Sequence, residues 1–298
     1  HYLMADGTPF HSQEGWQTMQ YNQEFKNRDP RMAQTIAAPD YVAVGTDAST
    51  KYYPSCKDYD RSGYRPIKYF SDDTHDGATT STTDYAVFRY GEVLLNYAEA
   101  KAELGQADQT IIDQTVNVIR SRVGMPALDV VKANAAPDSF LSSYYTDKHL
   151  EGADKGLILE IRRERTVELV NEGFRLWDML RWHEGQQLCP ASNTLGPGFI
   201  GCWFPGLGEY DMNNDGIPDL CIYTGTKPST DCENTLDVSE GKENTLSEGT
   251  SGYLIQFKDQ TYKWEEKDYL YPIPVKQIQI YPKDEATGES VLTQNPGY

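Results

Sequence analysis

The sequence predicts a mainly α-helical fold that carries long irregular loops and a few short strands. Residues 86–104 and 108–122 place apolar side chains at helical spacing on either side of Gly105, which indicates a helical hairpin. Residues 155–184 keep the same period over the longest stretch of the chain. Residues 186–262 are instead rich in Gly, Pro, Asn, Thr and Asp, which favours loops.

The composition narrows the classes of function. The chain has 298 residues, with 27 basic and 45 acidic side chains and a net charge of −18. Nucleic acids and anionic membranes are recognised through basic patches, so this charge argues against both as partners. No apolar stretch approaches the roughly 18 residues that a membrane-spanning helix needs. The length suits one large domain or two small ones.

Residues 1–85 are aromatic and only weakly periodic, and their prolines interrupt any long element. We expect loops, short helices and one strand at residues 66–70. Such loops are either plain surface connections or carriers of a binding site on a rigid scaffold. The chain begins at His1 and shows no signal peptide, so we expect a processed chain or a fragment whose missing part lies upstream.

The helical hairpin follows. Asp84 is a candidate cap for the first helix and Gly105 its end. The apolar positions of this helix lie on one face: Tyr90, Val93, Leu94, Tyr97, Ala98 and Leu104. The second helix presents Ile112, Val116 and Ile119 together, and Gly124 and Pro126 stop it.

The helix predicted over 155–184 is rich in charges of opposite sign three or four residues apart, which stabilise a helix as ion pairs. Glu164 and Glu168 lie one turn apart on it. The two carboxylates of a glycosidase face each other across the substrate, usually from different elements. We therefore interpret Glu164 and Glu168 as ion-pair partners. After the loop-rich stretch, residues 267–282 are predicted to be extended.

Four of the five cysteines fall within the loop-rich residues 186–262: Cys189, Cys202, Cys221 and Cys232. Their spacing is too wide for a Cys-x-x-Cys zinc site. In an oxidising compartment we expect disulfides, with sequence neighbours paired as 189–202 and 221–232. Cys56 is then left over, as a buried thiol or as the partner of a segment outside this chain. Free thiols in a reducing compartment are the alternative.

The segment DMNNDGIPD, residues 211–219, resembles a calcium-binding loop. Its candidate ligands are the side chains of Asp211, Asn213, Asp215 and Asp219 and the backbone carbonyl of Ile217. They occupy the first, third, fifth, ninth and seventh positions of such a loop, and Gly216 takes the sixth, where a sharp turn is needed. The twelfth position is Ile222 and not Glu, which excludes a paired EF-hand and favours a single loop completed by another segment. We expect structural Ca²⁺ here; a turn rich in Asp and Asn without metal is the alternative.

No catalytic set is evident in the sequence. It lacks a Gly-x-Ser-x-Gly motif, a phosphate-binding loop and a dinucleotide fingerprint, and no nucleophile has an evident base beside it. His183 and Glu184 have no second His at metal-ligand spacing. We therefore expect a protein that is not an enzyme.

Aromatic residues in loop segments are better candidates for function. Sugars present apolar C–H faces and hydroxyl edges, so rings flanked by polar groups suit them. We expect stacking platforms at Trp16, Tyr52, Tyr53, Tyr64 and Trp203. We expect hydrogen bonds to sugar hydroxyls from Asp58, Asp60 and Arg61. A single aromatic residue is more typical of a core, so the prediction depends on the clusters at 52–64 and 203–210.

Several segments together resemble the SusD/RagB family. They are RYGEVLLNYAEAKAELG (89–105), VNVIRSRVGMP (116–126), IRRERTVELVNEGFRLWDMLRW (161–182), YLYPIP (269–274) and QNPGY (294–298). NRDPRMAQTI (27–36) is similar to the family's segment upstream of the first helix. The motifs occur in the family's order over residues 27–298.

The resemblance implies tetratricopeptide-like helix pairs whose loops carry the ligand site. It implies a surface-exposed outer-membrane lipoprotein of Bacteroidetes-type bacteria, which binds glycans for polysaccharide utilization and delivers them to a SusC-like TonB-dependent transporter. Family members are usually longer and begin at a lipidated Cys, so we expect membrane association only through a lipid anchor outside this chain. Residues 1–298 then form the C-terminal region of such a protein, with a helical core at about 86–184, a loop-rich insertion at about 186–262 and a tail at 263–298.

Two other functions remain open. A RagB-like component would capture peptides in a groove, and an acidic groove would suit basic peptides. A structural lid of the transporter would have no ligand site of its own, and exposed aromatic platforms would count against it. The shared motifs are interpreted as structural, so the candidate ligand residues depend on the aromatic clusters alone.

Overall fold

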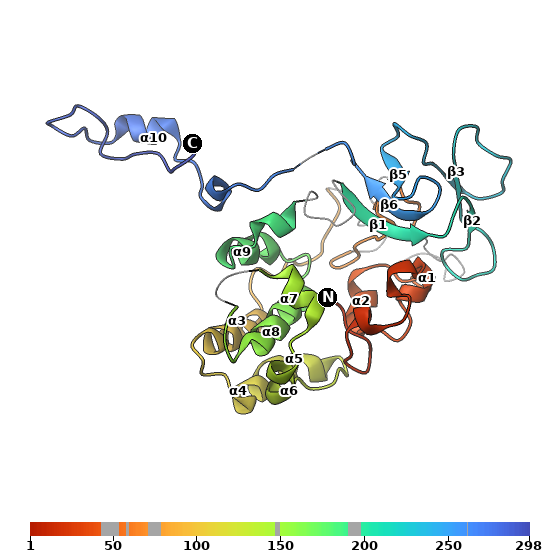
Figure 1. Ribbon diagram of the computed structural model, residues 1–298, viewed down its shortest axis with the longest axis horizontal. Helices are drawn as coiled ribbons and strands as arrows, with labels where there is room; N and C mark the ends of the chain where they lie inside the picture. Colours follow the sequence, from red (N-terminus) through yellow and green to blue (C-terminus); the bar gives the residue numbers. More distant parts are fainter. Residues whose placement is uncertain (43–53, 58–59, 71–78, 147–149, 190–197, 261) are drawn as a thin grey trace.

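The computed structural model describes residues 1–42, 54–57, 60–70, 79–146, 150–189, 198–260 and 262–298. Helices from the middle of the chain form one half of the molecule and the strands form the other, and the N-terminal segment lies alongside both (Figure 1). Residues 262–298 extend away from the body, and we call them the C-terminal arm (Figure 1). The predicted mainly helical fold with a few short strands is confirmed, and tetratricopeptide-like pairing stays a prediction.

The helical half is built around one helix that is buried on nearly every side. Its helices are α3 (Tyr90–Glu103), α4 (Gln109–Gln114), α5 (Val116–Arg122), α6 (Val130–Ala135), α7 (Ser139–Tyr144), α8 (Lys155–Glu168) and α9 (Phe174–Arg181), followed by the 3₁₀ turn η4 (Gly185–Leu188). The central helix α8 packs against α3, α6 and α7. Leu157, Leu159 and Ile161 of α8 are fully buried in the hydrophobic core of this half. A helix covered on all sides also buries its charged positions, which must then find partners.

Two predicted helices are each divided in the structure. The single helix predicted over 155–184 is wrong, because Asn171 and Gly173 adopt left-handed backbone angles (φ 60° and 84°) between α8 and α9. The helix predicted over 108–122 breaks at Thr115, whose φ of −128° and ψ of −91° lie outside the helical region. The Thr115 hydroxyl donates to the carbonyl of Ile111 (2.6 Å), which stabilises the break.

Other local predictions also need correction. Helices α6 and α7 were not foreseen, although Asp129 and Asp138 cap them by accepting backbone N–H groups. The first helix begins at Tyr90 and not near Asp84. Residues 66–70 form only an isolated bridge between Pro66 and Ile36 instead of a strand. The segment predicted to be extended over 267–282 contains the 3₁₀ turn η6 (Glu266–Tyr269) and the helix α10 (Val275–Ile280).

The loop-rich stretch folds into small sheets. Its described strands are β1 (Phe199–Phe204), β2 (Gly208–Tyr210), β3 (Leu220–Tyr223), β4 (Asn234–Asp237), β5 (Asn244–Leu246) and β6 (Gly252–Gln256). One sheet has the order β1-β6-β5 and is antiparallel. In the other sheet β3 pairs antiparallel with β2 and parallel with β4. Because the strands are short and the loops between them are long, the composition of this stretch predicts loops and does not reveal the sheets.

A second hydrophobic core joins these sheets to the N-terminal segment. That segment contains the 3₁₀ turns η1 (Phe10–Ser12) and η2 (Trp16–Thr18) and the short helices α1 (Tyr21–Glu24) and α2 (Pro30–Thr35). The second core is formed by Tyr21, Cys56, Cys202, Phe204, Met212, Leu220, Ile222, Leu236, Val238, Leu246 and Leu254. Residues from the N-terminal segment and from the strands therefore share one core.

The C-terminal arm is mostly exposed. Val275 and Ile280 of α10 are 64% and 73% exposed, and Tyr271 is 61% exposed. In the part of the chain that the structure describes, no helix is both long and apolar enough to span a bilayer.

Candidate functional site

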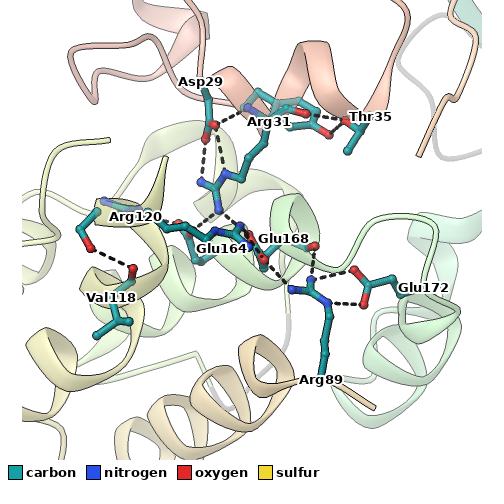
Figure 2. A network of polar contacts seen from close by, with 12 residues as sticks. Asp29, Arg31, Thr35, Arg89, Val118, Arg120, Glu164, Glu168 and Glu172 are labelled. Atoms are coloured by element: carbon teal, nitrogen blue, oxygen red, sulfur yellow. Dashed lines mark hydrogen bonds and ion pairs between the residues drawn. The ribbon is translucent and has the colours of Figure 1, made fainter. Parts of the chain in front are cut away.

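Buried ion pairs connect α8 to the segments packed around it (Figure 2). Glu164, whose side chain is 1% exposed, accepts hydrogen bonds from Arg31 of α2 and from Nε of Arg120 of α5 (2.9 Å). Arg31 also binds the carboxylate of Asp29, the residue that caps α2. Three elements distant in sequence are thus joined at one carboxylate.

Glu168 lies one turn further along α8 and has even more partners. It accepts from Arg31 (3.1 Å), Arg89 (2.7 Å) and Arg122 (2.8 Å). Burial acts to raise the pKa of Glu168, but the three arginines outweigh it and the net pKa is lowered. Both glutamates are therefore structural ion-pair partners, as the sequence predicts.

An aromatic cluster on the outer side of the β1-β6-β5 sheet is the strongest candidate for a binding site. Trp203 of β1 lies directly opposite Tyr253 of β6. The neighbours of Trp203 along the strand, Cys202 and Phe204, are 0% and 2% exposed and belong to the second core. Because side chains alternate along a strand, Trp203 and Tyr253 lie on the opposite, outer face, where both are half-buried.

Trp16 joins this cluster from the other end of the chain. The turn η2 packs against β1, and the Tyr253 hydroxyl donates to the carbonyl of Gln17. Trp16 is half-buried, and its ring meets Phe10 edge-on at 6.1 Å between centroids. We call Trp16, Trp203 and Tyr253 the aromatic face. The structure therefore brings two of the predicted platforms together and adds Tyr253, which sequence reasoning missed.

Other predicted residues lie elsewhere. Tyr64 packs against Tyr21 at the second core (6.0 Å between ring centroids), and its hydroxyl donates to Glu24 (2.6 Å). Burial raises the pKa of Tyr64 well above its usual range, and Cys202 and Glu24 raise it further. Tyr64 thus contributes to the core and does not present a free ring face.

The polar candidates are also dispersed. Arg61 forms an ion pair with Glu243, and its guanidinium lies 5.9 Å from the ring centroid of Phe257. Phe257 directly follows the last residue of β6, whereas Tyr253 lies near the first, so Arg61 is at the other end of this strand. Asp60 is buried and accepts from the backbone N–H and the hydroxyl of Ser55, both at 2.7 Å. The remaining candidates, Tyr52, Tyr53 and Asp58, lie outside the described residues.

A cavity of about 620 Å³ was not foreseen from the sequence. It lies between α9, the start of β1 and the C-terminal arm. Its aromatic lining is Phe199, Tyr262, Trp264, Tyr271 and Tyr298. The motif YLYPIP was a possible signal, but nothing in the sequence shows that it faces α9.

The candidate calcium residues form a tight loop between β2 and β3. Asp211 accepts from the backbone N–H of Gly216 (2.8 Å), Asp215 from Ile217 (2.9 Å) and Asp219 from Met212 (2.9 Å). Burial is the main cause that raises the pKa of Asp219 to about 6, and the nearby charges of Asp215 and Asp211 add to it.

Asn213 and Ile217 belong to the same loop, and its backbone turns at Gly216, which has a φ of 88°. Across the described residues, no group of three or more His, Cys, Asp or Glu side chains lies close enough to hold a metal ion. Calcium at this loop therefore stays a prediction.

The structure does not bring together the expected pair Cys189 and Cys202. Cys189 lines the 620 Å³ cavity, whereas Cys202 lies in the second core beside Cys56. The pairing 189–202 is wrong, because Cys189 is a partly buried residue at the cavity and Cys202 is fully buried in the second core. Cys221 of β3 and Cys232 before β4 are both buried, and their pairing stays a prediction.

These features define a helical scaffold with a strand-rich region that carries exposed aromatic side chains. Comparison with known proteins identifies the family: the sequence profile of the SusD family matches residues 1–298, so the chain belongs to the SusD/RagB family. A curated relative, SusD-like protein P38 of Formosa agariphila, is 32% identical over 113 residues, which are 38% of this chain and 20% of the relative.

Solved structures agree on the fold. A SusD-like carbohydrate binding protein from Bacteroides fragilis superimposes with a TM-score of 0.56 at 24% identity, over 94% of this chain and 45% of that one. Another SusD-like protein from the same species has a TM-score of 0.56 at 23% identity, over 100% of this chain and 45% of that one. The chain thus spans less than half the length of these structures and a fifth of the curated relative.

Proposed function

We propose that the protein is a non-enzymatic surface protein that binds oligosaccharides or polysaccharides and delivers them to a TonB-dependent outer-membrane transporter. The observation that carries the proposal is the aromatic face, where Trp203 and Tyr253 lie side by side on the sheet and the turn that bears Trp16 packs against the same strand. A solved relative in the same family is described as a carbohydrate binding protein, which supports this ligand class.

The physical argument rests on how the rings are held. A sugar stacks its C–H face on an aromatic ring, and the contact is favourable when the ring is already fixed in place. Tyr253 is fixed by its hydrogen bond to Gln17, and Trp16 by its edge contact with Phe10. Trp16 and Trp203 are both half-buried, so each residue packs against the protein and still keeps some surface in contact with solvent.

The state of the carboxylates supports a binding protein over an enzyme. Glu164 and Glu168 are the carboxylates that the sequence places one turn apart, and both are bonded to buried arginines. A general acid needs a raised pKa, whereas the pKa of Glu168 is lowered.

Family membership supports the proposed partner and location. We infer a SusC-like transporter as partner and a lipid anchor outside these 298 residues at the outer membrane. The outer side of α3 exposes Tyr90 (71%), Tyr97 (44%) and, just beyond its end, Leu104 (67%), which suits a protein partner.

We also propose a structural Ca²⁺ ion at residues 211–219. The loop supplies carboxylate oxygens from Asp211, Asp215 and Asp219, which are the hard ligands that Ca²⁺ takes. Asp211 and Asp215 also lie close enough to Asp219 to add to the rise that burial causes in its pKa, so the loop gathers negative charge that a divalent cation would offset. The loop leads into β3, so the ion would stabilise the sheet region and leave the aromatic face unaltered.

The experiment is a binding screen against soluble polysaccharides and a peptide library, with and without Ca²⁺, followed by affinity electrophoresis of variants. For a retained polysaccharide, Trp203→Ala is expected to weaken binding at least tenfold, or about 1.4 kcal/mol. The matched control is Trp177→Ala, a 56% exposed tryptophan on α9 beside Tyr271. Unchanged retention by Trp203→Ala at wild-type melting temperature would remove the aromatic face from the site, and a hit only among peptides would favour the RagB-like alternative.

A further inference from the structure

Two cysteines from distant parts of the chain meet inside the second core. Cys56 lies in the described residues 54–57, and Cys202 lies in the middle of β1. Both are 0% exposed. The sequence left Cys56 without a partner, and its neighbour in space is a cysteine that sequence spacing had assigned elsewhere.

The surroundings of Gly63 show that the two sulfur atoms lie close to the same point. A Cβ placed on Gly63 would overlap the Sγ of Cys202 and would lie 3.5 Å from the Sγ of Cys56. Both sulfur atoms therefore lie within 3.5 Å of one point. Gly63 also has a φ of 83°, so its missing side chain both permits the turn and leaves room for the two sulfurs.

The backbones that carry the two cysteines are held together without help from the sulfurs. The N–H of Cys202 donates to the carbonyl of Ser62 (2.8 Å), which ties the turn to β1. The Nδ2 of Asn244 in β5 donates to the carbonyl of Cys56 (3.4 Å). Cys56 and Cys202 are free thiols in the structure, and these bonds tie the segment that carries each one to the sheet β1-β6-β5.

We propose that Cys56 and Cys202 form a disulfide in the mature protein, a modification site that fastens the segment carrying Cys56 to the strand bearing Trp203. The proposal rests on the proposed function in one respect, because a surface protein matures where disulfides persist. Each thiol loses its proton, an S–S bond forms, and the two electrons and two protons reduce the disulfide of a thiol–disulfide oxidant to two thiols.

The buried environment of Cys56 and Cys202 also determines at which stage of folding the disulfide can form. Burial raises the pKa of Cys56 and of Cys202, so neither thiol is a ready nucleophile once the core has closed. The exchange must therefore occur during folding, while the segment can still reach the oxidant. Afterwards the same burial protects the bond from reductants, which makes it a structural cross-link and not a switch.

The test uses the whole 298-residue chain refolded in a buffer of reduced and oxidised glutathione, alkylated and digested with trypsin without reduction. Cys56 lies on the tryptic peptide 52–57, whereas the other four cysteines share the peptide 182–242 because Lys227 precedes Pro228. Peptide 52–57 is expected to stay attached to 182–242 until reductant is added. Cys202→Ser is expected to release it, and the matched control Cys189→Ser is expected to leave it attached.

A second digestion makes the test independent of how the variants fold. Chymotrypsin cuts after Phe199 and Trp203, so the linked wild-type product should contain residues 200–203 joined to the Cys56 fragment. Alkylated Cys56 in unreduced wild-type protein, or its attachment to the fragment holding Cys189, overturns the proposal. Because refolding supplies the oxidant, this result is independent of cellular location, and glycan retention measured on the same oxidised sample tests the proposed function separately.

Discussion

Replacing Glu168 by Gln tests whether the buried ion pairs hold the helical half together. The Glu168 side chain is 3% exposed, and it accepts from Arg31, Arg89 and Arg122, whose side chains are 4%, 23% and 56% exposed. Gln keeps the size but removes the charge that three arginines share.

The expected loss of unfolding free energy depends on which ion-pair partners each arginine still has after the substitution. Breaking a buried ion pair costs about 3–5 kcal/mol, whereas a pair on an exposed arginine contributes about 0–1 kcal/mol. Arg31 retains Asp29, and Arg89 retains Glu172 at 2.6 Å. These remaining partners place the expected loss near the lower end, at about 3 kcal/mol of unfolding free energy at pH 7. With an unfolding entropy of about 2.1 cal/mol/K per residue, a chain of 298 residues would show a melting temperature lower by roughly 5 °C.

The pH dependence of the stability difference between wild type and Glu168→Gln shows whether the carboxylate charge, and not the shape of the side chain, causes it. The pKa of Glu168 is lowered in the folded protein, so its stabilisation is present above the unfolded-state pKa of about 4.3 and is lost as the pH falls through the folded-state pKa. The gap between wild type and Glu168→Gln should therefore be full at pH 7 and narrow progressively below about pH 4.3.

Urea unfolding followed by circular dichroism at pH 7 and at acid pH measures this gap. The matched control is Glu266→Gln, because Glu266 is 83% exposed and pairs with His183 at the surface, so no change is expected. A gap under 1 kcal/mol at pH 7, or one that stays constant into acid, would refute the reasoning.

Three further substitutions or additions test other parts of the structure. Gly156→Ala places a Cβ against the carbonyl oxygen of Ala133 where α8 crosses α6, and it should cost about 1–3 kcal/mol in urea unfolding; an unchanged midpoint would show that the crossing is looser. Tyr64→Phe removes the hydrogen bond to buried Glu24 and should lower stability by about 1–2 kcal/mol while polysaccharide retention stays the same; lost retention at wild-type stability would return Tyr64 to the ligand site. Millimolar Ca²⁺, but not Mg²⁺, should raise the melting temperature of the wild type and not of Asp215→Asn, and calorimetry without binding heat would contradict a calcium site.

Local sequence patterns located the helices α3, α5 and α8 because these helices show a short-range apolar periodicity. Helix α3 follows from apolar residues at spacings of three and four, and it ends before Gly105 at a φ of 63°. The charges of α8 were recognised as ion-pair partners from their spacing. Their true partners are Arg31, Arg89 and Arg120 on other elements, and no local pattern contains that information.

The strand-rich half was harder to foresee because its strands are short and its pairings are long-range. Strand β1 pairs with β6 across the whole stretch between Phe204 and Gly252, and a three-residue strand such as β5 has too few positions to show alternation. The breaks at Thr115 and Gly173 were missed because a helical period can continue through a turn that changes the direction of the chain.

The sequence by itself determined the family, the helix-dominated class and the chemistry of the side chains, because motifs, periodicity and composition are local properties. The tertiary structure decided which of those side chains meet. Trp16 joins Trp203 because η2 packs on β1, Tyr64 faces the core, and Cys56 lies beside Cys202 and not beside a sequence neighbour. The physical reason is that packing joins the N-terminal segment to strands roughly 150 or more residues further along the chain, and spacing along the sequence carries no record of that packing.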